Sequence, residues 1–292
     1  MSFSLLRTAD RLVTELWKAT FWTAGGRGDA VIRWHTPGGL RVMVVAPHPD
    51  DEVAGCAGVI LLHQQAGDAV SVVHVTDGRR SRASGLDPEN TARQRREEAR
   101  GSLATLGIPD SHWMGLPEGE WSDQVLTLEL ETIIKSRAPD ILYAPSRIDF
   151  HPEHWKVARV LASLPSLSRI SHVRQYQVHV PLTGVLVNLV APLANVTTQA
   201  RAASAHYVSQ AGSLRGPWRL KAYAAKRHRV AVEAEEFWQL TPSAYSALHA
   251  EHPPRPLTKT FRGLRRRSLT DPLAFLVGMA ERRRLRALAN PS

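Results

Sequence analysis

The sequence has very little cysteine: Cys56 is the single example among 292 residues. No disulfide can therefore form within the chain, which fits a protein of a reducing compartment. A structural zinc site usually closes four ligands that include cysteines, so one thiol disfavours that class of site as well. A chain of this length can bury a sizeable core without either kind of crosslink.

Long apolar runs are also missing. The longest candidate, residues 184–196, is too short to span a bilayer and is interrupted by Asn188, Pro192 and Asn195. The N-terminal residues lack a secretory signal's basic flank, apolar block and cleavage site in that order. We therefore expect a cytoplasmic location. Hydrophobic residues at 43% and charged residues at 22% exclude collagen-like, coiled-coil and mostly disordered chains.

Acidic residues are scarce relative to basic ones, and the excess lies near the C-terminus. The whole chain has a formal net charge of +10, and residues 255–292 contain ten Lys or Arg against two acidic residues. Two basic clusters, 262–267 and 282–286, flank an apolar run. We interpret residues 253–292 as a basic, partly helical tail outside the catalytic core.

Three interpretations of this tail remain open. It is either a solvated, disordered segment, a peripheral contact with an anionic membrane surface, or a nucleic-acid contact. The rest of the chain is nearly neutral and contains no recognised nucleic-acid motif, so no nucleic-acid partner is expected. Membrane contact would suit a lipid-linked substrate.

Strand and helix patterns alternate from residue 41 onward. This order predicts βαβ units and an α/β fold with a Rossmann-like, mostly parallel sheet flanked by helices. Short β-branched apolar runs predict strands at residues 41–47, 69–76, 112–116, 141–145, 173–180 and 185–190. Helical patterns occupy residues 53–66, 88–106, 125–137, 153–164, 199–211 and 223–238.

The chain divides into three parts. Residues 5–21 place apolar side chains at helical spacing and predict an amphipathic helix that packs on the body. A glycine-rich connector follows it. The predicted organisation is this helix and connector at 1–40, a catalytic domain at 41–252 and the basic tail at 253–292.

Charged side chains follow the first predicted strand directly. His48, Asp50, Asp51 and Glu52 come after residues 41–47, and in open parallel sheets ligands bind at the carboxyl ends of strands. His48 and Asp51 are three residues apart, so on a first helical turn they can face one point and supply half of a metal site. Asp50 would then stand beside the metal, available as a base. The plainer alternative is a helix start whose acidic residues favour the helix dipole.

A second polar cluster follows the strand at residues 141–145. It contains Asp149, His151 and His154. A histidine pair is weak evidence alone, but two clusters at two strand ends reinforce each other. His48, Asp51 and one of these histidines make a two-histidine, one-carboxylate set with open positions, which is typical of a catalytic metal. Such a set serves Fe²⁺ as well as Zn²⁺.

These motifs resemble those of the LmbE-like or PIG-L family of zinc-dependent de-N-acetylases. The motif Pro-His-Pro-Asp-Asp-Glu begins at Pro47, and Asp-x-His-x-x-His begins at Asp149. Weaker matches fall in the family's order at residues 75–78, 95–98, 106–108, 205–210 and 235–237. The resemblance covers roughly residues 41–240.

The resemblance implies a hydrolase that removes an N-acetyl or other N-acyl group from an amino sugar or glycoconjugate. It implies that His48, Asp51 and His154 bind the metal, with zinc as that metal. It also implies that Asp50 is the general base and that His151 stabilises the oxyanion. Two departures from the family pattern concern Glu153, where Asp is usual, and the late strand, where an acidic residue is replaced by His179 or Asn188.

Other polar residues have two interpretations each. Asp149 can orient a ligand histidine by accepting its ring N–H. Arg79, with its neighbours Arg80 and Arg82, can bind a sugar or phosphate group, or form a solvated loop. Arg95 can contact the substrate or form an ion pair on a helix face. His206 can contact the substrate or serve as a structural histidine.

Two alternative functions accompany the leading one. A deacylase of an acylated secondary metabolite would use the same site on another substrate. A non-catalytic glycoconjugate-binding module would keep the fold alone, although the intact set of histidines and aspartates argues against it. The expected partner is a small-molecule or lipid-linked amino-sugar substrate, and the sequence predicts no particular oligomeric state.

Overall fold

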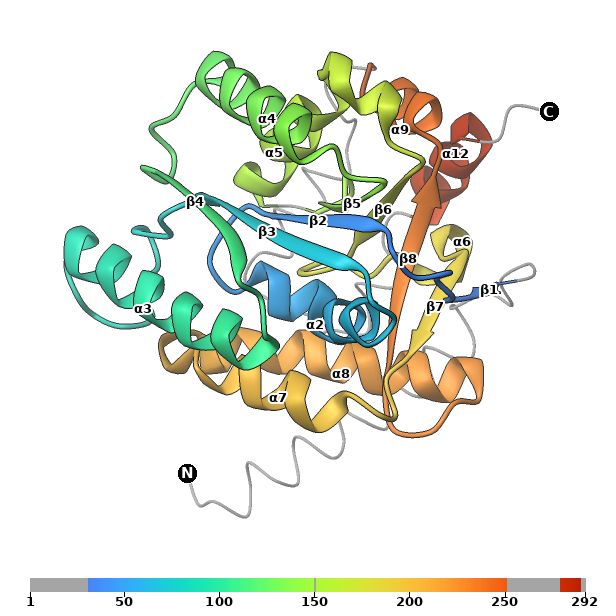
Figure 1. Ribbon diagram of the computed structural model, residues 1–292, viewed down its shortest axis with the longest axis horizontal. Helices are drawn as coiled ribbons and strands as arrows, with labels where there is room; N and C mark the ends of the chain where they lie inside the picture. Colours follow the sequence, from blue (N-terminus) through green and yellow to red (C-terminus); the bar gives the residue numbers. More distant parts are fainter. Residues whose placement is uncertain (1–30, 150, 251–278, 290–292) are drawn as a thin grey trace.

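The computed structural model describes residues 31–149, 151–250 and 279–289. In these residues a mixed sheet lies between two layers of helices (Figure 1). The strands are β1 (Ile32–Arg33), β2 (Arg41–Ala46), β3 (Ala69–Thr76), β4 (Asp110–Leu116), β5 (Ile141–Pro145), β6 (His172–Tyr176), β7 (Leu189–Pro192) and β8 (Ala234–Leu240).

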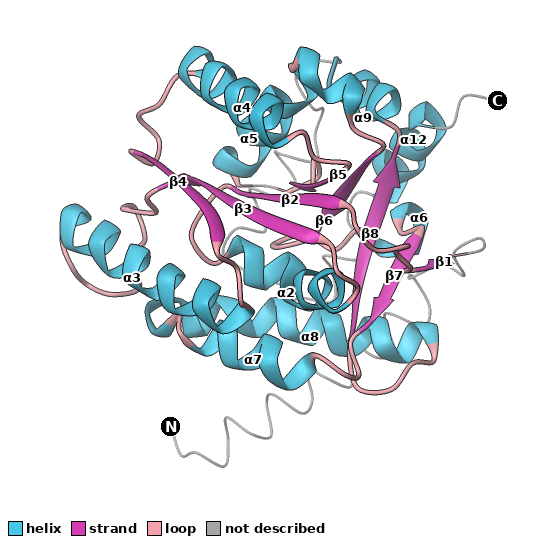
Figure 2. Ribbon diagram, in the orientation of Figure 1, coloured by secondary structure: helices cyan, strands magenta, loops and turns pink. Residues whose placement is uncertain are grey.

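Helices surround this sheet on both faces. They are α2 (Asp51–Gln65), α3 (Pro88–Leu106), α4 (Asp123–Arg137), α5 (Pro152–Ser163), α6 (Thr183–Leu186), α7 (Thr197–Ala205), α8 (Ala211–His228), α9 (Pro242–Ala250) and α12 (Met279–Ala289), with 3-10 turns η1 (Pro165–Arg169) and η2 (Val208–Gln210). Figure 2 shows α2, α7 and α8 below the sheet and α4, α5 and α9 above it. No helix in the described ranges is long and apolar enough to cross a membrane.

The sheet has the strand order β1-β7-β8-β6-β5-β2-β3-β4. Strands β6, β5, β2, β3 and β4 are mutually parallel, while β8 runs antiparallel to both β6 and β7. The predicted mostly parallel α/β fold is confirmed. Because β2 pairs with β3 on one side and with β5 on the other, the chain reverses its direction of travel across the sheet there. The carboxyl ends of β2 and β5 therefore form the switch point at which such sheets bind ligands.

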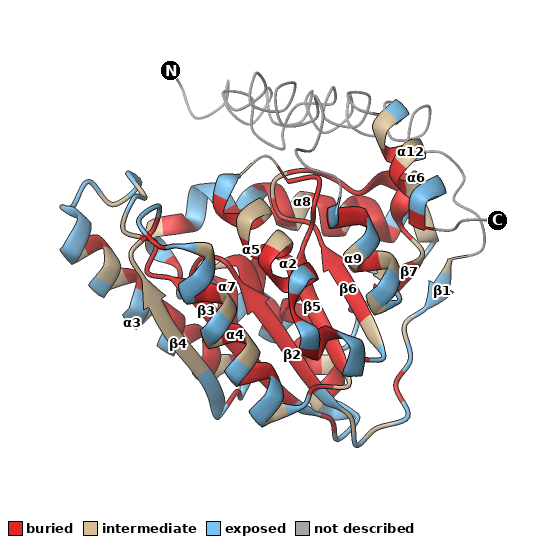
Figure 3. Ribbon diagram, turned by 90° about the horizontal axis from the view of Figure 1, so that it is seen from above, coloured by how far each residue is buried: buried red, intermediate tan, exposed pale blue. Residues whose placement is uncertain are grey.

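The core is built from the alternation of side chains along the central strands. Val42 and Val44 of β2 pack with residues of α2, α3 and α7, whereas Met43 and Val45 pack with residues of α4 and α5. A parallel strand that is buried on both faces needs apolar residues at every position, which is the pattern read from the sequence. Figure 3 shows these central strands buried between their helices.

Two expected elements are wrong. The pattern at residues 223–238 predicted a helix, but α8 ends at His228 and β8 begins at Ala234. Strand β8 contains two adjacent glutamates that are both buried: Glu235 pairs with Lys221, and Glu236 lies 2.7 Å from the His228 ring. Partners on α8 allow these carboxylates to enter the interior, and sequence spacing alone does not reveal such pairing.

The other incorrect expectation is a strand at residues 185–190. There the chain forms the short helix α6 and only then enters β7, which is held between β1 and β8. The remaining predicted strands and helices are present with shifted ends, such as β6, which stops at Tyr176. The predicted amphipathic helix at residues 5–21 lies outside the described residues.

Helix α12 corrects the picture of a separate basic tail. Its Arg282 is fully buried and donates a hydrogen bond to the Pro181 carbonyl oxygen at 2.8 Å. Its Leu285 and Ala289 belong to the same hydrophobic cluster as α4, α5 and α9. Residues 279–289 therefore pack in the body, whereas residues 251–278 lie outside the described ranges.

Replacing Leu285 with alanine tests this packing. Leu285 is 1% exposed, so Leu285→Ala leaves a cavity and should lower the free energy of unfolding by about 2–5 kcal/mol. Leu288 of the same helix is 38% exposed, and Leu288→Ala should have an effect of about 0.5 kcal/mol or less. Urea unfolding followed by circular dichroism measures both, and equal effects of the two substitutions would contradict the packing of α12.

Candidate active site

The first polar cluster lies at the carboxyl end of β2. Asp51 is the first residue of α2, and its Oδ2 accepts a hydrogen bond from the His48 backbone N–H at 2.8 Å. The same oxygen lies 3.3 Å from His48 Nδ1. The turn from strand to helix therefore places both side chains on one side of the sheet edge, and both are buried.

The second cluster meets the first across the switch point. His154 Nε2, on α5, lies 3.1 Å from His48 Nδ1 and 3.1 Å from Asp51 Oδ2. Three donor atoms are thus 3.1–3.3 Å apart. Ligands of a tetrahedral metal with bonds of about 2.1 Å lie about 3.4 Å apart. The three atoms have nearly this spacing, so the site fits a divalent metal.

A wider set of histidines surrounds these atoms. His48, His151 and His154 each offer a nitrogen within 4.8 Å of the others, and so do the potential ligand atoms of Asp149, His154 and His179. His48 Nε2 is buried with no hydrogen-bond partner among the described residues, although Glu118 Oε1 lies 3.4 Å from it. The part of the chain that is described therefore concentrates nitrogen donors here.

The charge of the site also fits a cation. Burial disfavours the charged form of His48, but Asp51 and Glu118 outweigh burial and raise its pKa to about 9. Burial likewise opposes a charge on His154, whose pKa is nevertheless raised well above its usual range by Asp51 and Asp149. The buried carboxylates thus favour positive charge on two neighbouring rings, and a divalent cation supplies positive charge at the same place.

Asp149 orients His154. Its Oδ2 lies 3.1 Å from His154 Nδ1, so the carboxylate accepts the ring hydrogen there and leaves the Nε2 lone pair directed toward His48 and Asp51. Asp149 also accepts from the His151 and His179 backbone N–H groups at 3.0 and 3.1 Å. One buried carboxylate therefore fixes the ring and two neighbouring loop segments.

Asp50 has a strained backbone. Its φ angle is 119°, a region that residues other than glycine rarely adopt and that costs about 1–3 kcal/mol. Two contacts hold it there: its N–H donates to Glu52 Oε2 at 3.1 Å, and Arg95 Nη2 donates to its Oδ1 at 2.7 Å. Burial raises the pKa of Asp50 to about 6, against the opposing charge of Arg95.

Glu52 is the buried support of this turn. Besides Asp50 it contacts His74 Nε2 at 3.1 Å and Tyr207 Oη at 2.6 Å, and it is fully buried. Arg95 is 4% exposed and also donates to the Pro49 carbonyl oxygen. In the structure Arg95 therefore holds the backbone and carboxylate of the Asp50 turn while lining the site cleft.

His151 begins α5 and lies edge-on to His48, with ring centroids 4.6 Å apart. Its Nδ1 accepts a hydrogen bond from the Glu153 backbone N–H at 3.3 Å, which places the ring hydrogen on Nε2. Burial and then the charges of His48 and His154 hold the pKa of His151 well below its usual range. A neutral His151 can therefore still donate a hydrogen bond through Nε2.

Sequence reasoning missed part of the cleft wall. The cleft beside the three donor atoms is also lined by Glu118, Val178 and Gln210. Glu118 follows β4, so the strand-end rule that found the first two clusters would have found it as well. His179, noted only as a departure from the family pattern, lies in the same wall and stacks on His151 with centroids 5.6 Å apart.

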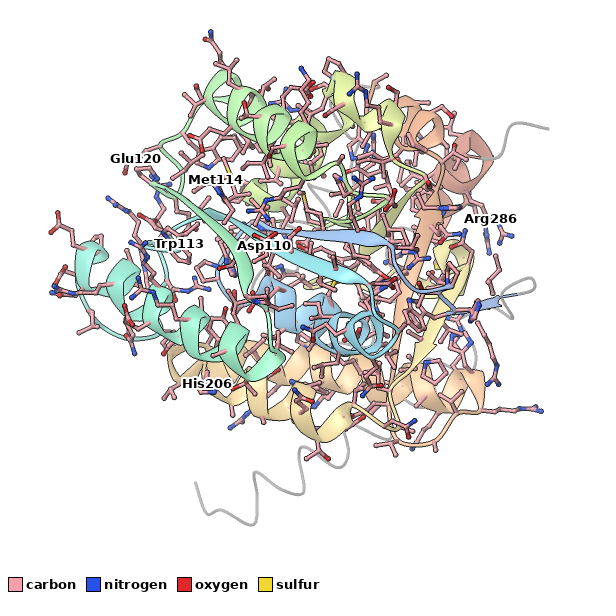
Figure 4. All side chains as sticks on the ribbon, in the orientation of Figure 1. Asp110, Trp113, Met114, Glu120, His206 and Arg286 are labelled. Atoms are coloured by element: carbon pink, nitrogen blue, oxygen red, sulfur yellow. The ribbon has the colours of Figure 1, made fainter. Side chains whose placement is uncertain are left out.

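Two weaker candidates, His206 and Arg79, do not line the cleft. His206 Nε2 lies 2.8 Å from Thr105 Oγ1 on α3, and His206 does not line the cleft. Figure 4 shows His206 beside the helices below the sheet, whereas Glu120 lies above it on the same side of the view. Arg79 lies beside the cleft, where its Nε donates to Asp77 Oδ2 at 2.6 Å.

Comparison with known proteins agrees with this geometry. Residues 43–164, which contain both polar clusters, match the family model PIG-L, described as GlcNAc-PI de-N-acetylase. The resemblance found in the sequence is confirmed.

One curated protein that is similar to this chain is named a probable N-acetyl-alpha-D-glucosaminyl L-malate deacetylase 2 of Bacillus anthracis. It is 30% identical over 147 residues, which cover 44% of this chain and 62% of the relative. The chain thus spans less than two thirds of that relative's length.

Solved structures show the same fold. The N,N'-diacetylchitobiose deacetylase of Pyrococcus horikoshii superposes with a TM-score of 0.59 at 20% identity, over 84% of this chain and 95% of the other. GalB of Pseudomonas putida KT2440, named a 4-carboxy-2-hydroxymuconate hydratase, superposes with a TM-score of 0.57 at 19% identity, over 68% and 95%. Since the fold occurs in a protein named as a hydratase, the reaction must be argued from the site.

Substituting Asp149 tests its orienting role. Asp149→Asn can no longer accept ring hydrogens as a carboxylate, and we expect the affinity for Zn²⁺ to fall by about 10- to 100-fold. The matched control is Asp140→Asn, since Asp140 pairs with Arg41 at the opposite edge of the sheet. Competition with a chromophoric chelator measures both affinities, and unchanged affinity in a folded Asp149→Asn protein would rule out the orienting role.

Proposed function

We propose that this protein is a zinc-dependent hydrolase that removes an N-acetyl or other N-acyl group from an amino sugar or glycoconjugate. The observation that carries this proposal is the set of three donor atoms, 3.1–3.3 Å apart, beside the carboxylate of Asp50. The names of two proteins similar to it, deacetylases of an N-acetylglucosaminyl malate and of diacetylchitobiose, support the substrate class.

His48, Asp51 and His154 would hold the metal. The mixed nitrogen and oxygen donor set suits zinc and also Fe²⁺, and the family resemblance favours zinc. A divalent metal bound there would lower the pKa of water and polarise the amide carbonyl. Three protein ligands leave coordination positions open for these groups, as catalytic sites require.

Asp50 is the residue suited to move the proton. It lines the cleft beside the three ligands, and its backbone strain and its contact with Arg95 fix the carboxylate in place. Asp50 would accept the proton of the attacking water and later deliver it to the leaving amine. The C–N bond breaks as the tetrahedral intermediate collapses, which releases acetate or another acid and the free amine.

His151 is suited to the oxyanion. Its ring hydrogen lies on Nε2, because Nδ1 accepts from the Glu153 backbone. His151 Nε2–H would donate to the oxygen that gains negative charge when water adds to the carbonyl, an effect typically worth a few kcal/mol. A binding module without catalysis would need neither this donor nor a strained aspartate.

Metal content is the first test of this proposal. Elemental analysis should find about one equivalent of zinc per chain, and the His48→Ala, His154→Ala double variant should lose it because two of three ligands are gone. The control is the His172→Ala, His206→Ala double variant, since neither residue lines the cleft. No metal in the unmodified protein after loading would overturn the hydrolase mechanism.

Catalysis is tested at Asp50. Asp50→Asn should retain the metal and lower the rate of acetate release from N-acetyl amino sugars by about 10²- to 10⁴-fold, because the amide cannot accept the water proton. Asp123→Asn is the control, since Asp123 pairs with Arg159 at the start of α4. An Asp50→Asn protein that released acetate at the rate of the unmodified protein would exclude Asp50 as the base.

A further inference from the structure

A second cleft adjoins the proposed active site. It has a volume of about 960 Å³ and lies at the loop between β3 and α3. Its wall consists of Arg79, Arg80, Ser81, Arg82, Gly85, Leu86, Pro88 and Glu120. Arg80 and Ser81 line the active-site cleft as well, so the two spaces share a wall.

Arginine side chains supply most of the charge in this second cleft, which we call the arginine cleft. Its wall contains three arginines, Arg79, Arg80 and Arg82, and one acidic residue, Glu120, while Arg79 is also paired with Asp77. The general basicity of the chain does not explain this excess, because most of the net charge of +10 lies in residues 255–292. The local charge is therefore a property of this loop.

The first half of this loop is anchored at two residues, Arg79 and Ser81. Asp77, which is buried, accepts from the Arg79 backbone N–H at 3.1 Å and from Arg79 Nε at 2.6 Å. On the other side, Gln210 Nε2 donates to Ser81 Oγ at 2.9 Å and ties the loop to the wall of the active-site cleft. The arginines are thus presented on a fixed segment next to the site.

Several N–H donors in the arginine cleft have no partner among the residues that the structure describes. Arg79 contacts Asp77 through Nε, and no described residue bonds its Nη1 or Nη2. Arg82 is exposed and has no hydrogen-bond or ion-pair partner among the described residues. Arg80 Nη2 lies 3.7 Å from Glu120 Oε1, and both side chains are more than half exposed, so this contact is weak. By contrast, Arg100 on the outer face of α3 is paired with Glu97 at 2.7 Å.

We propose that the arginine cleft binds a negatively charged group, a carboxylate or a phosphate, on the part of the substrate that does not carry the N-acyl group. Guanidinium groups that are held in place with free N–H donors bind such anions through paired hydrogen bonds. Because Arg80 and Ser81 belong to both clefts, one molecule can place its N-acyl group at His48 and its anion at Arg82. This inference rests on the proposed function and specifies its substrate class as anionic conjugates of amino sugars.

The test compares charged and neutral substrates. N-acetylglucosaminyl L-malate and N-acetylglucosamine 1-phosphate provide the anions, and methyl N-acetylglucosaminide is the neutral reference. For the unmodified protein we expect kcat/KM to be higher for an anionic substrate at low salt, with the preference decreasing as salt increases. Equal kcat/KM for all three substrates would overturn the proposal.

Substitution of Arg82 tests whether the preference for anionic substrates arises in the arginine cleft. In Arg82→Ala the ratio of kcat/KM between anionic and neutral substrates should fall by about 10- to 100-fold, because a hydrogen bond to a charged group is lost. Arg82→Glu should reduce the ratio further. Arg100→Ala is the matched control and should leave the ratio unchanged. A ratio that persists in both Arg82 variants would overturn the assignment.

Binding measurements separate this proposal from the proposed function. Calorimetry with the deacylated products, glucosaminyl malate and methyl glucosaminide, needs no turnover. If no substrate releases acetate but the binding of glucosaminyl malate still depends on Arg82, the proposed function fails and the anion site stands. If acetate is released but neither kcat/KM nor binding depends on charge, the anion site fails alone.

A final comparison of two substrates shows whether the anion is a lipid-borne or a soluble phosphate. N-acetylglucosaminyl phosphatidylinositol in neutral vesicles presents a lipid-borne phosphate, whereas N-acetylglucosamine 1-phosphate is soluble. Dependence on Arg82 with either substrate supports the arginine cleft, and the substrate with the larger kcat/KM identifies the source. Loss of Arg82 dependence with both overturns the proposal.

Discussion

The parallel pairing of β2 with β5 is the constraint on which the site depends. Val42, Met43 and Val44 are in register with Ile141, Leu142 and Tyr143, and this backbone register brings two helix starts to the same sheet edge. His48 and His154 are 106 residues apart in the sequence, yet their ring nitrogens lie 3.1 Å apart. Neither helix start could bring these three donor atoms together alone, because each supplies only part of the set.

Buried charge is organised outward from this edge. Asp51 faces the two histidine nitrogens, Asp149 holds the far side of His154, and Glu52 holds the strained turn that presents Asp50. Each carboxylate that leaves water has a partner, as burial of a charge requires. The site is therefore a connected network in which residues that line the cleft, such as Asp50 and His151, are held by residues that do not line it, such as Glu52 and Asp149.

Much of this arrangement follows from the sequence, and the exceptions have physical causes. Continuous β-branched runs identify β2, β3 and β5, and the polar residues directly after two of them identify the site. Strand β8 was not predicted because two adjacent glutamates, Glu235 and Glu236, suggest an exposed segment. Their pairing with Lys221 and His228 allows both carboxylates to be buried in the sheet. Long-range ion pairs leave no local periodicity, and the same holds for the burial of Arg282.

The hydrogen bond from Arg282 to the Pro181 carbonyl has a consequence for biosynthesis. Pro181 lies two residues after His179 in the wall of the cleft, and Arg282 is translated 101 residues later. A nascent chain can form the parallel core while this part of the wall still lacks its support from α12. A chain that ends after β8 and before α12 would thus contain every strand of the sheet but lack this support for the cleft wall.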